Sequence, residues 1–217
     1  MGAPGSPPPG SPGERPLRIG VLASQGDFAA HARILGSLGA EAVEVRTPKA
    51  LASLDGLVIP GGESTTITKA IERDRLAPAI RSHAEEGRPI LGTCAGLIVC
   101  DREHLGLLDA TVRRNAYGRQ LQSFETDLEV EGIGPEPLRA VFIRAPWVES
   151  HGPGVEVLAS YQGHPVAVRE GPILACSFHP ELTEDSRFHA LLMAIATAGR
   201  ASRIESPSMD RTEEERR

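Results

Sequence analysis

The spacing of hydrophobic residues divides this chain into two parts. Between residues 17 and 101, short and fully apolar runs alternate with segments whose apolar residues recur every three or four positions. The short runs predict buried strands, and the segments with the longer period predict amphipathic helices. Alternation of the two patterns is typical of a parallel sheet flanked by helices.

This first part contains four predicted strands and at least three predicted helices. The strands are residues 17–24, 42–45, 56–59 and 89–91, and the helices are residues 28–38, 65–73 and 76–86, with another helix beginning after residue 94. Asp27 is a candidate N-cap of the first helix, and Gly39 and Gly87 are candidate C-terminal stops.

The second part begins after Leu105 and is rich in strand-like segments. They are residues 110–113, 124–130, 140–143, 155–160 and 166–169, and a last helix is predicted over residues 185–197. We therefore expect an α/β fold with a mostly parallel central sheet, flanked by helices and extended by antiparallel strands. Residues 17–199 form a single predicted domain, between a Pro/Gly-rich disordered tail (residues 1–16) and a charged C-terminal tail (residues 200–217).

Composition narrows the possible functions. The 217 residues are 40% hydrophobic, with a formal net charge of −6 and an isoelectric point of about 5.7. This balance supports a normal globular core and lacks the basic stripe of a nucleic-acid-binding protein. No apolar run approaches the ~20 residues that span a bilayer, and residues 1–16 lack the apolar core of a signal peptide.

Cysteine usage favours a reducing compartment. The three cysteines, Cys94, Cys100 and Cys176, are odd in number and lack the spacing of metal ligands. They fit a cytoplasmic protein better than a disulfide framework or a zinc site. We expect no metal and no cofactor, and we expect Cys100 and Cys176 to be core residues.

The segment Gly92-Thr93-Cys94-Ala95-Gly96 is the most informative motif. It lies between two apolar runs, so it predicts a strand, a sharp turn with cysteine at its apex, and a helix start. Glycines two residues on either side relieve clashes in such a turn, and a helix N-terminus stabilises a thiolate. The alternative is a buried cysteine that acts only as a small core hydrophobe.

His179 and Glu181 form a second candidate pair, after the apolar run at residues 173–176. In extended chain, residues two apart point the same way, so the carboxylate can hold the imidazole while its other nitrogen faces a nucleophile. The alternative is a surface His-Pro-Glu turn.

A third motif, Pro60-Gly61-Gly62-Glu63-Ser64, follows the predicted strand at residues 56–59. Paired glycines let the backbone approach a ligand and present its N–H groups. An N–H of Gly61 or Gly62, together with the N–H of Ala95, could form an oxyanion hole. The segment could equally be an ordinary loop before a helix capped by Ser64 or Thr65.

In this order, these motifs resemble class I glutamine amidotransferases, and within that class the glutaminase subunits of pyridoxal 5′-phosphate synthase. The resemblance covers roughly residues 17–199 and implies a flavodoxin-like three-layer sandwich. The matching blocks are residues 60–66, 92–98, 114–115, 118–120, 142–146 and 176–185.

The resemblance implies an activity and roles for individual residues. Cys94 is the nucleophile that attacks L-glutamine, His179 transfers protons and Glu181 orients His179. Glutamine contacts match the family at Gly62, Glu63, Ser64, Arg114, Ile143 and Arg144. The ammonia would pass through a channel to a synthase subunit that makes pyridoxal 5′-phosphate, and Gln25-Gly26 matches a loop near that partner.

The chain departs from the family pattern after Cys94. Only residues 99–103 separate the cysteine motif from His104-Leu-Gly-Leu-Leu108, where the family usually has a longer stretch. We therefore expect a short helix after Cys94.

Three other interpretations compete with this one. An amidotransferase of another pathway, such as histidine biosynthesis, generally lacks the blocks at residues 60–66 and 142–146. A non-catalytic interaction subunit would not need the complete set of Cys94, His179 and Glu181. A cysteine hydrolase or peptidase would not need the residues that match glutamine contacts.

Overall fold

The computed structural model describes residues 15–23, 28–118 and 123–205. The strands in chain order are β1 (Arg18–Leu22), β2 (Glu41–Val45), β3 (Gly56–Ile59), β4 (Ile90–Thr93), β5 (Ala110–Arg113), β6 (Ser123–Leu128), β7 (Leu138–Ile143), β8 (Trp147–His151), β9 (Glu156–Tyr161), β10 (His164–Glu170) and β11 (Ile173–Cys176). The helices are α1 (Phe28–Ser37), α2 (Pro48–Leu51), α3 (Ser64–Arg73), α4 (Ala77–Glu85), α5 (Ala95–Cys100), the 3₁₀ helix η1 (Pro180–Leu182) and α6 (Arg187–Glu205).

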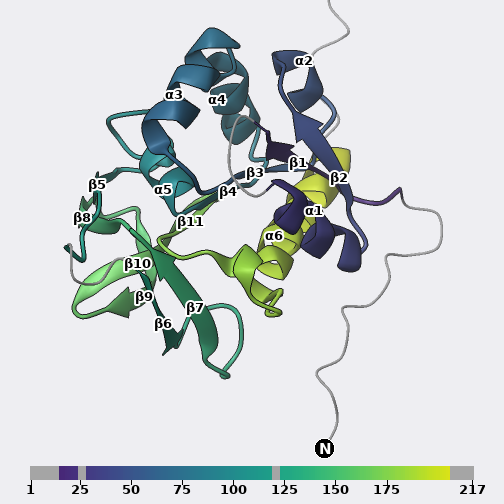
Figure 1. Cartoon of the computed structure of the whole chain (residues 1–217). Coiled ribbons are helices and arrows are strands. Elements are labelled where there is room, and N and C mark those ends of the chain that lie inside the picture. The colour runs from purple at the N-terminus through teal and green to yellow at the C-terminus, as the bar shows by residue number, and fades with distance from the viewer. Residues whose placement is uncertain (1–14, 24–27, 119–122, 206–217) are drawn as a thin grey trace, which may run out of the picture.

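A seven-stranded sheet forms the centre of the fold, in the order β2-β1-β3-β4-β11-β10-β9. The neighbours from β2 to β11 are parallel, and β10 pairs antiparallel with both β11 and β9. This arrangement confirms the predicted α/β fold with a mostly parallel sheet. In Figure 1, α1 and α6 lie together on one side of the parallel strands, and α3, α4 and α5 lie on the other.

Alternation along the strands supplies two hydrophobic cores, one on each face of the sheet. Leu57 and Ile59 of β3 pack with α3, α4 and α5, whereas Val58 packs with α1 and α6. All three side chains are completely buried. A strand buried on both faces is apolar throughout, which explains why β3 was recognisable from the sequence.

The antiparallel extension is smaller than expected. Only β9 and β10 extend the main sheet, while β5 with β8 and β6 with β7 form two separate two-stranded sheets. Strand β8 was not predicted, because its sequence Trp-Val-Glu-Ser-His lacks a clear apolar alternation. These small sheets lie beside β9 and β10 in Figure 1.

Aromatic rings connect the β6–β7 sheet to the chain segment that carries His179. Phe124 stacks on Phe142 with ring centroids 4.6 Å apart, and Phe142 meets Phe178 edge to face at 5.8 Å. The N–H of His179 also donates to the carbonyl of Val141, at 2.8 Å. Strand β7 therefore fixes the position of the His179 backbone.

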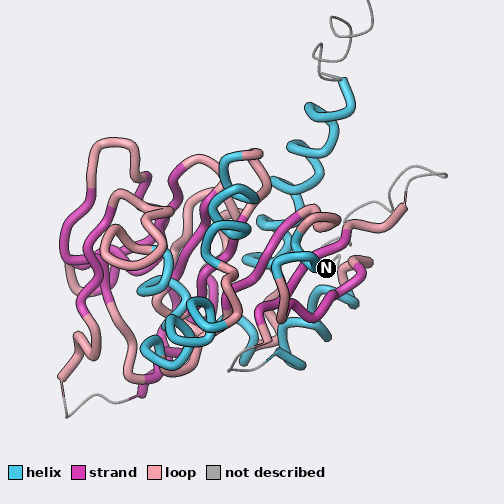
Figure 2. The backbone as a smooth tube through the Cα atoms, turned by 90° about the horizontal axis from the view of Figure 1, so that it is seen from above, coloured by secondary structure: helices cyan, strands magenta, loops and turns pink. Residues whose placement is uncertain are grey.

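The predicted helix ends were mostly accurate. Gly39 and Gly87 both have positive φ angles, of 86° and 71°, directly after helices. Helix α5 is short, as expected, but α6 continues to Glu205 rather than ending near residue 197. Its last turns extend beyond the body of the fold in Figure 2.

The predicted cap Asp27 and most of both predicted tails lie outside the described residues.

None of the helices in the described part of the chain is long and apolar enough to cross a membrane.

Helix α5 packs so closely on β3 that a side chain at Gly96 would not fit. A Cβ atom on Gly96 would lie 2.1 Å from the carbonyl oxygen of Ile59. Because that oxygen belongs to the backbone of a buried strand, it cannot move aside cheaply. The glycine thus brings the start of α5 against the end of β3.

We expect Gly96→Ala to lower the free energy of unfolding by about 1–3 kcal/mol or more, because it overpacks a rigid contact. Gly36→Ala in α1 is the matched control, since a Cβ there meets nothing within 4 Å. Alanine favours helix over glycine by up to about 1 kcal/mol, so the control should be neutral or stabilising. Urea unfolding of both variants measures the difference. Equal stability of the two proteins would contradict the close packing.

Candidate active site

The carboxyl ends of β3, β4 and β11 meet at one edge of the sheet, and the three motifs found in the sequence follow these ends. Parallel sheets commonly bind ligands at this edge. Cys94 follows β4, Gly61 and Gly62 follow β3, and His179 and Glu181 follow β11. The structure therefore brings together motifs that are up to about 120 residues apart in the sequence.

Cys94 occupies a strained turn at the start of α5. Its backbone angles are φ 49° and ψ −105°, outside the regions that non-glycine residues ordinarily adopt. Such strain persists only where the surroundings enforce it, and the Cys94 N–H is held by the carbonyl of Cys176 at 2.8 Å. The Cys94 sulfur lies 3.8 Å from the carbonyl oxygen of Ile143.

His179 and Glu181 form a buried hydrogen-bonded pair. His179 Nδ1 lies 2.7 Å from Glu181 Oε1, and only 2% of the Glu181 side chain is exposed. Burial disfavours a charged imidazole, but hydrogen bonds with Cys94 and Glu181 outweigh burial and raise the pKa of His179 to about 10.

Burial also disfavours the Glu181 carboxylate, which is compensated from two sides. The hydrogen bond with His179 and the nearby His31 hold the pKa of Glu181 below its usual range. The pair therefore carries opposite charges at neutral pH, with His179 oriented by Glu181.

The two glycines after β3 differ in their surroundings. The N–H of Gly61 donates to the Thr93 hydroxyl at 3.1 Å, whereas Gly62 has a φ of 140° and lies on the wall of the cavity. A Cβ on Gly61 would lie 2.6 Å from His179 Cε1, so only glycine fits there. Of the three residues expected to supply oxyanion N–H groups, Gly62 and Ala95 line the cavity, whereas Gly61 does not.

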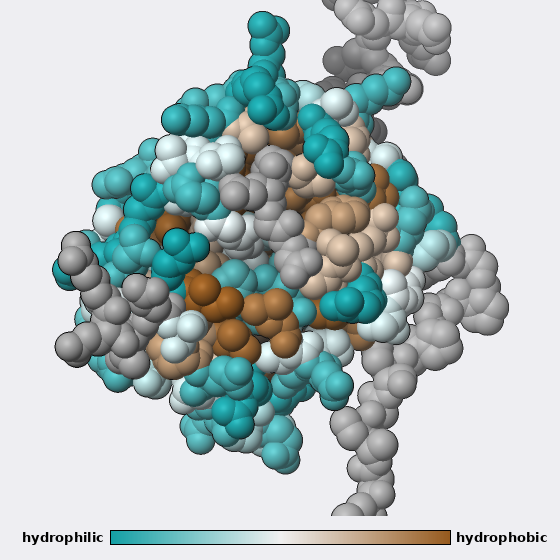
Figure 3. Space-filling view, in the orientation of Figure 1, coloured by the Kyte–Doolittle hydropathy of each residue, from teal (hydrophilic) through white to brown (hydrophobic). Residues whose placement is uncertain are grey.

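A cavity of about 400 Å³ opens in front of Cys94. Its lining includes Cys94 and His179 together with the predicted glutamine-contact residues Gly62, Glu63, Ser64, Arg114, Ile143 and Arg144. Ala95, Ile98, Asn115 and Pro146 complete the wall. On the face shown in Figure 3, hydrophobic residues form a band bordered by hydrophilic ones.

Glu63, rather than Ser64 or Thr65, caps helix α3. Its carboxylate accepts hydrogen bonds from the N–H groups of Thr65 and Thr66, at 3.1 and 2.7 Å, and from the Thr66 hydroxyl at 2.8 Å. The Thr66 hydroxyl and the two backbone N–H groups lower the pKa of Glu63 to about 2. Aspartate and asparagine are commoner caps than glutamate, so the sequence did not reveal this role.

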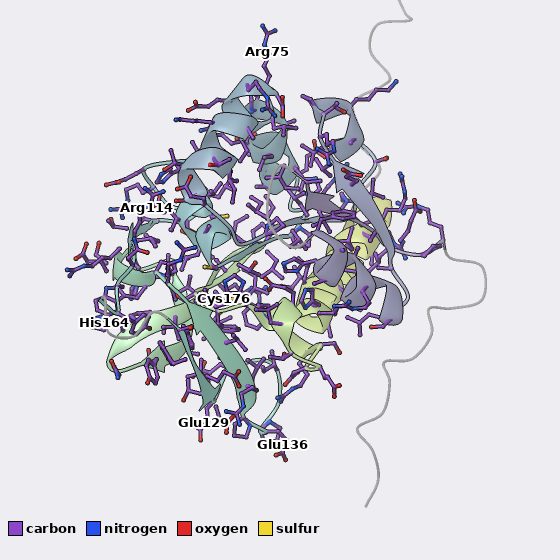
Figure 4. The ribbon with its side chains drawn as sticks, in the orientation of Figure 1. Arg75, Arg114, Glu129, Glu136, His164 and Cys176 are labelled. Carbon is purple, nitrogen blue, oxygen red and sulfur yellow. The ribbon has the colours of Figure 1, made fainter. Side chains whose placement is uncertain are left out.

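The two arginines reach the cavity from different segments. Arg114 donates to the Thr65 hydroxyl at 3.2 Å and lies 3.9 Å from Glu63 Oε1. Arg144 follows β7 and has a φ of 45°, next to the partly exposed Ile143. In Figure 4, Arg114 lies toward the periphery of the fold and Cys176 near its centre.

Several residues near the site had no role assigned from the sequence. Asn115 and Pro146 occur in motifs that matched the family, whereas Thr93 precedes Cys94 and had no role assigned. The buried His31 comes from α1 and looked like an ordinary core position. Gln25 and Gly26, expected near a partner, lie outside the described residues. Within the described residues, no group of three or more His, Cys, Asp or Glu side chains is placed to hold a metal ion.

Comparison with known families identifies the class to which this fold and site belong. The model of the SNO glutamine amidotransferase family matches residues 21–197. Because this match spans most of the sequence, the chain belongs to the SNO glutamine amidotransferase family.

Its sequence relatives carry a more specific name. "Pyridoxal 5′-phosphate synthase subunit PdxT" of Niallia circulans is 53% identical over 184 residues, covering 82% of this chain and 96% of the relative. The protein of the same name from Dehalococcoides mccartyi (strain CBDB1) is 52% identical over 195 residues, covering 85% of this chain and all of the relative.

Solved structures agree with this placement. A crystal structure titled as a glutamine amidotransferase superposes with a TM-score of 0.79 at 48% identity, covering 82% of this chain and 98% of that one. A structure titled as a putative GMP synthase protein from Thermoplasma acidophilum has a TM-score of 0.71 at 22% identity, covering 88% of this chain and 99% of that one, which shows a shared fold.

The three cysteines differ in their surroundings, and this difference generates a prediction. Cys94 lines the cavity, while Cys100 and Cys176 are completely buried. Burial raises the pKa of Cys100 to about 12 and that of Cys176 well above its usual range. A glutamine-analogue electrophile should therefore label Cys94 and spare the other two, as read by mass spectrometry of the peptides. Labelling that persists in a Cys94→Ala variant would contradict this assignment.

Proposed function

We propose that this chain is the glutaminase subunit of a pyridoxal 5′-phosphate synthase. It hydrolyses L-glutamine to glutamate and ammonia, and the ammonia passes to a synthase subunit. The observation that carries the proposal is the placement of Cys94, His179 and Glu181 at adjoining strand ends beside a cavity. Membership in a glutamine amidotransferase family supports the choice of glutamine as the substrate.

The proposed reaction has two halves. The Cys94 thiolate attacks the carbon of the side-chain carboxamide, and the imidazolium of His179 gives its proton to the departing ammonia. This step leaves a γ-glutamyl thioester and a neutral His179. Water then attacks the thioester as His179 removes its proton, which releases glutamate and restores the thiolate–imidazolium pair. Glu181 holds the imidazole in position throughout.

Backbone N–H groups stabilise the oxyanion that forms in each half. The Ala95 N–H at the start of α5 and the Gly62 N–H both belong to residues on the cavity wall. The Gly62 N–H lies in the peptide that joins the two glycines, and such a peptide rotates more easily than one between bulkier residues. Donors of this kind contribute roughly 3–4 kcal/mol each to transition-state stabilisation.

The charges on the cavity wall suit a zwitterionic amino acid. Arg114 and Arg144 can bind the α-carboxylate of glutamine, for which a guanidinium is well shaped. Glu63 stays ionised near Arg114 and presents a negative charge to the α-ammonium group. The backbone from Gly62 to Ser64 and the exposed Ile143 complete the proposed contacts with glutamine.

The proposed glutaminase domain spans residues 17–199. The proposed C-terminal tail begins inside α6, since that helix continues to Glu205. We place the protein in the cytoplasm, where its three free cysteines would remain reduced.

Substitution of the proposed triad tests the mechanism. Cys94→Ala should abolish glutamine hydrolysis, because no other described thiol reaches the cavity. His179→Asn should lower kcat by several orders of magnitude, and Glu181→Gln should cost less, roughly 10²–10⁴-fold. Glutamate release should be measured with the synthase subunit present. Retention of wild-type activity by Cys94→Ala would refute the mechanism.

Activation by the synthase subunit is a separate prediction. We expect the isolated chain to be a poor glutaminase, because Gly61 is bound to Thr93 and the adjoining peptide must reach the right orientation to stabilise an oxyanion. A preference of a few kcal/mol suffices, since each ~1.4 kcal/mol changes the rate tenfold. Steady-state hydrolysis by the pure chain is compared with hydrolysis after the synthase is added. Identical rates would contradict activation by the synthase subunit but would leave the glutaminase assignment intact.

A further inference from the structure

Two buried histidines stand behind Glu181, on the side away from the cavity. His31 comes from α1 and His189 from α6, and both are completely buried. His31 Nε2 lies 3.5 Å from Glu181 Oε2, and His31 Nδ1 lies 2.9 Å from His189 Nε2. The proposed reaction uses neither residue, and neither lines the cavity.

The second carboxylate oxygen of Glu181, Oε2, needs a hydrogen-bond donor. Glu181 Oε1 is occupied by His179, while Oε2 is buried and makes no close hydrogen bond to any described residue. A buried carboxylate oxygen without compensation is costly, because burial removes its hydration. His31 Nε2 is the nitrogen that faces this oxygen.

The partners of the two rings determine where their protons lie. Burial lowers the pKa of His189 to about 3, so its imidazole is neutral and carries one N–H. His189 Nδ1 has no hydrogen-bond partner among the described residues, so a proton there would be buried without an acceptor. The proton is therefore better placed on His189 Nε2, where it is donated to His31 Nδ1. His31 then carries its own proton on Nε2, the nitrogen that lies 3.5 Å from both Glu181 Oε2 and the Thr93 hydroxyl.

His31 also lies close to the segment that holds the glycine pair. Its Nε2 is 3.5 Å from the Thr93 hydroxyl, and that hydroxyl accepts the N–H of Gly61. One imidazole thus lies beside the Glu181 carboxylate and beside the hydroxyl group that anchors Gly61.

We propose that His31 is a positioning residue of this site, which holds Glu181 through Oε2, and that His189 fixes the orientation and tautomer of His31. The inference rests on the proposed glutaminase function, and it adds two residues from α1 and α6 to the parts on which the triad depends. Outer hydrogen-bond partners fix the orientation and tautomer of metal-binding histidines in a comparable way.

The charged groups around Glu181 determine how removal of His31 should change the pH dependence of Cys94 reactivity. The titratable groups that interact with Glu181 are His179, His31, His189 and Cys176. Removal of His31 takes away the side chain that holds Oε2, so the Glu181 carboxylate can turn away from His179 and then stabilises the His179 imidazolium less well. A weaker imidazolium in turn favours the Cys94 thiolate less, so a higher pH is needed to form the thiolate.

The test compares His31→Leu with His31→Gln, which keeps a side-chain N–H. We expect His31→Leu to lower kcat about ten- to hundredfold, as losses of orienting groups do. KM for glutamine should not change, because His31 lies behind the cavity wall. His31→Gln should recover most of the lost kcat. Activity is measured on the full chain with the synthase subunit.

Alkylation of Cys94 by iodoacetamide gives a second readout that needs neither glutamine nor partner. We expect the midpoint of its pH–rate profile to move to higher pH in His31→Leu. His189→Leu should give a smaller shift in the same direction, and it carries the test if His31→Leu does not fold. His83→Leu is the matched control, because His83 is a buried histidine on α4 whose two nitrogens have no hydrogen-bond partner among the described residues.

The outcomes separate this inference from the proposed function. A wild-type alkylation profile and wild-type kcat in His31→Leu would overturn the positioning role, as would equal losses in His83→Leu. If the wild-type chain shows no glutaminase activity with its partner but the alkylation midpoint still depends on His31, the proposed function fails and the positioning role stands.

Discussion

The hydrogen bond between His179 and Glu181 is the interaction on which the rest of the site depends, because it compensates a buried charge. A carboxylate that is 2% exposed is stable in its charged form only when its oxygens are compensated. His179 compensates one oxygen, and hydrogen bonds with Cys94 and Glu181 raise the pKa of His179 despite its burial. The other oxygen faces His31, so the charge in the catalytic region depends on where α1 lies relative to β11. The positions of α1 and α6 are thereby linked to the chemistry proposed for Cys94.

Close backbone approach is the second requirement, and glycine meets it at two points. Gly96 allows the carbonyl oxygen of Ile59 to lie where a side chain would begin, which brings α5 against β3. Gly61 leaves room for the ring of His179. These contacts let the segments that follow β3, β4 and β11 approach one another beside one cavity. The glycines in the three motifs therefore serve the spatial arrangement of the site as much as the local turns.

The sequence predicted the local parts of the structure, but it did not predict which of the later strands pair or which core residues lie behind the site. The apolar strand β3 and the turn at Cys94 were recognisable because their patterns fit within a few residues. The two-stranded sheets were not separable from the main sheet, because a pattern of alternation shows a strand but not its partner. His31 and His189 are 158 residues apart, and each alone resembles an ordinary core histidine. Only the packing of α1 and α6 on the same face places them behind Glu181.

Thr93 contacts both the glycine pair after β3 and the histidine that faces Glu181. Its hydroxyl accepts the Gly61 N–H at 3.1 Å and lies 3.5 Å from His31 Nε2. A hydroxyl has one proton and two lone pairs, so a change in one of its hydrogen bonds alters the geometry available to the others. If the peptide between Gly61 and Gly62 rotates to form an oxyanion hole, the Gly61 segment pulls on Thr93, and Thr93 faces the imidazole that also faces Glu181. In the proposed mechanism, the oxyanion hole and the His179–Glu181 pair therefore share contacts with one buried side chain, so rotation of the Gly61–Gly62 peptide is expected to affect both.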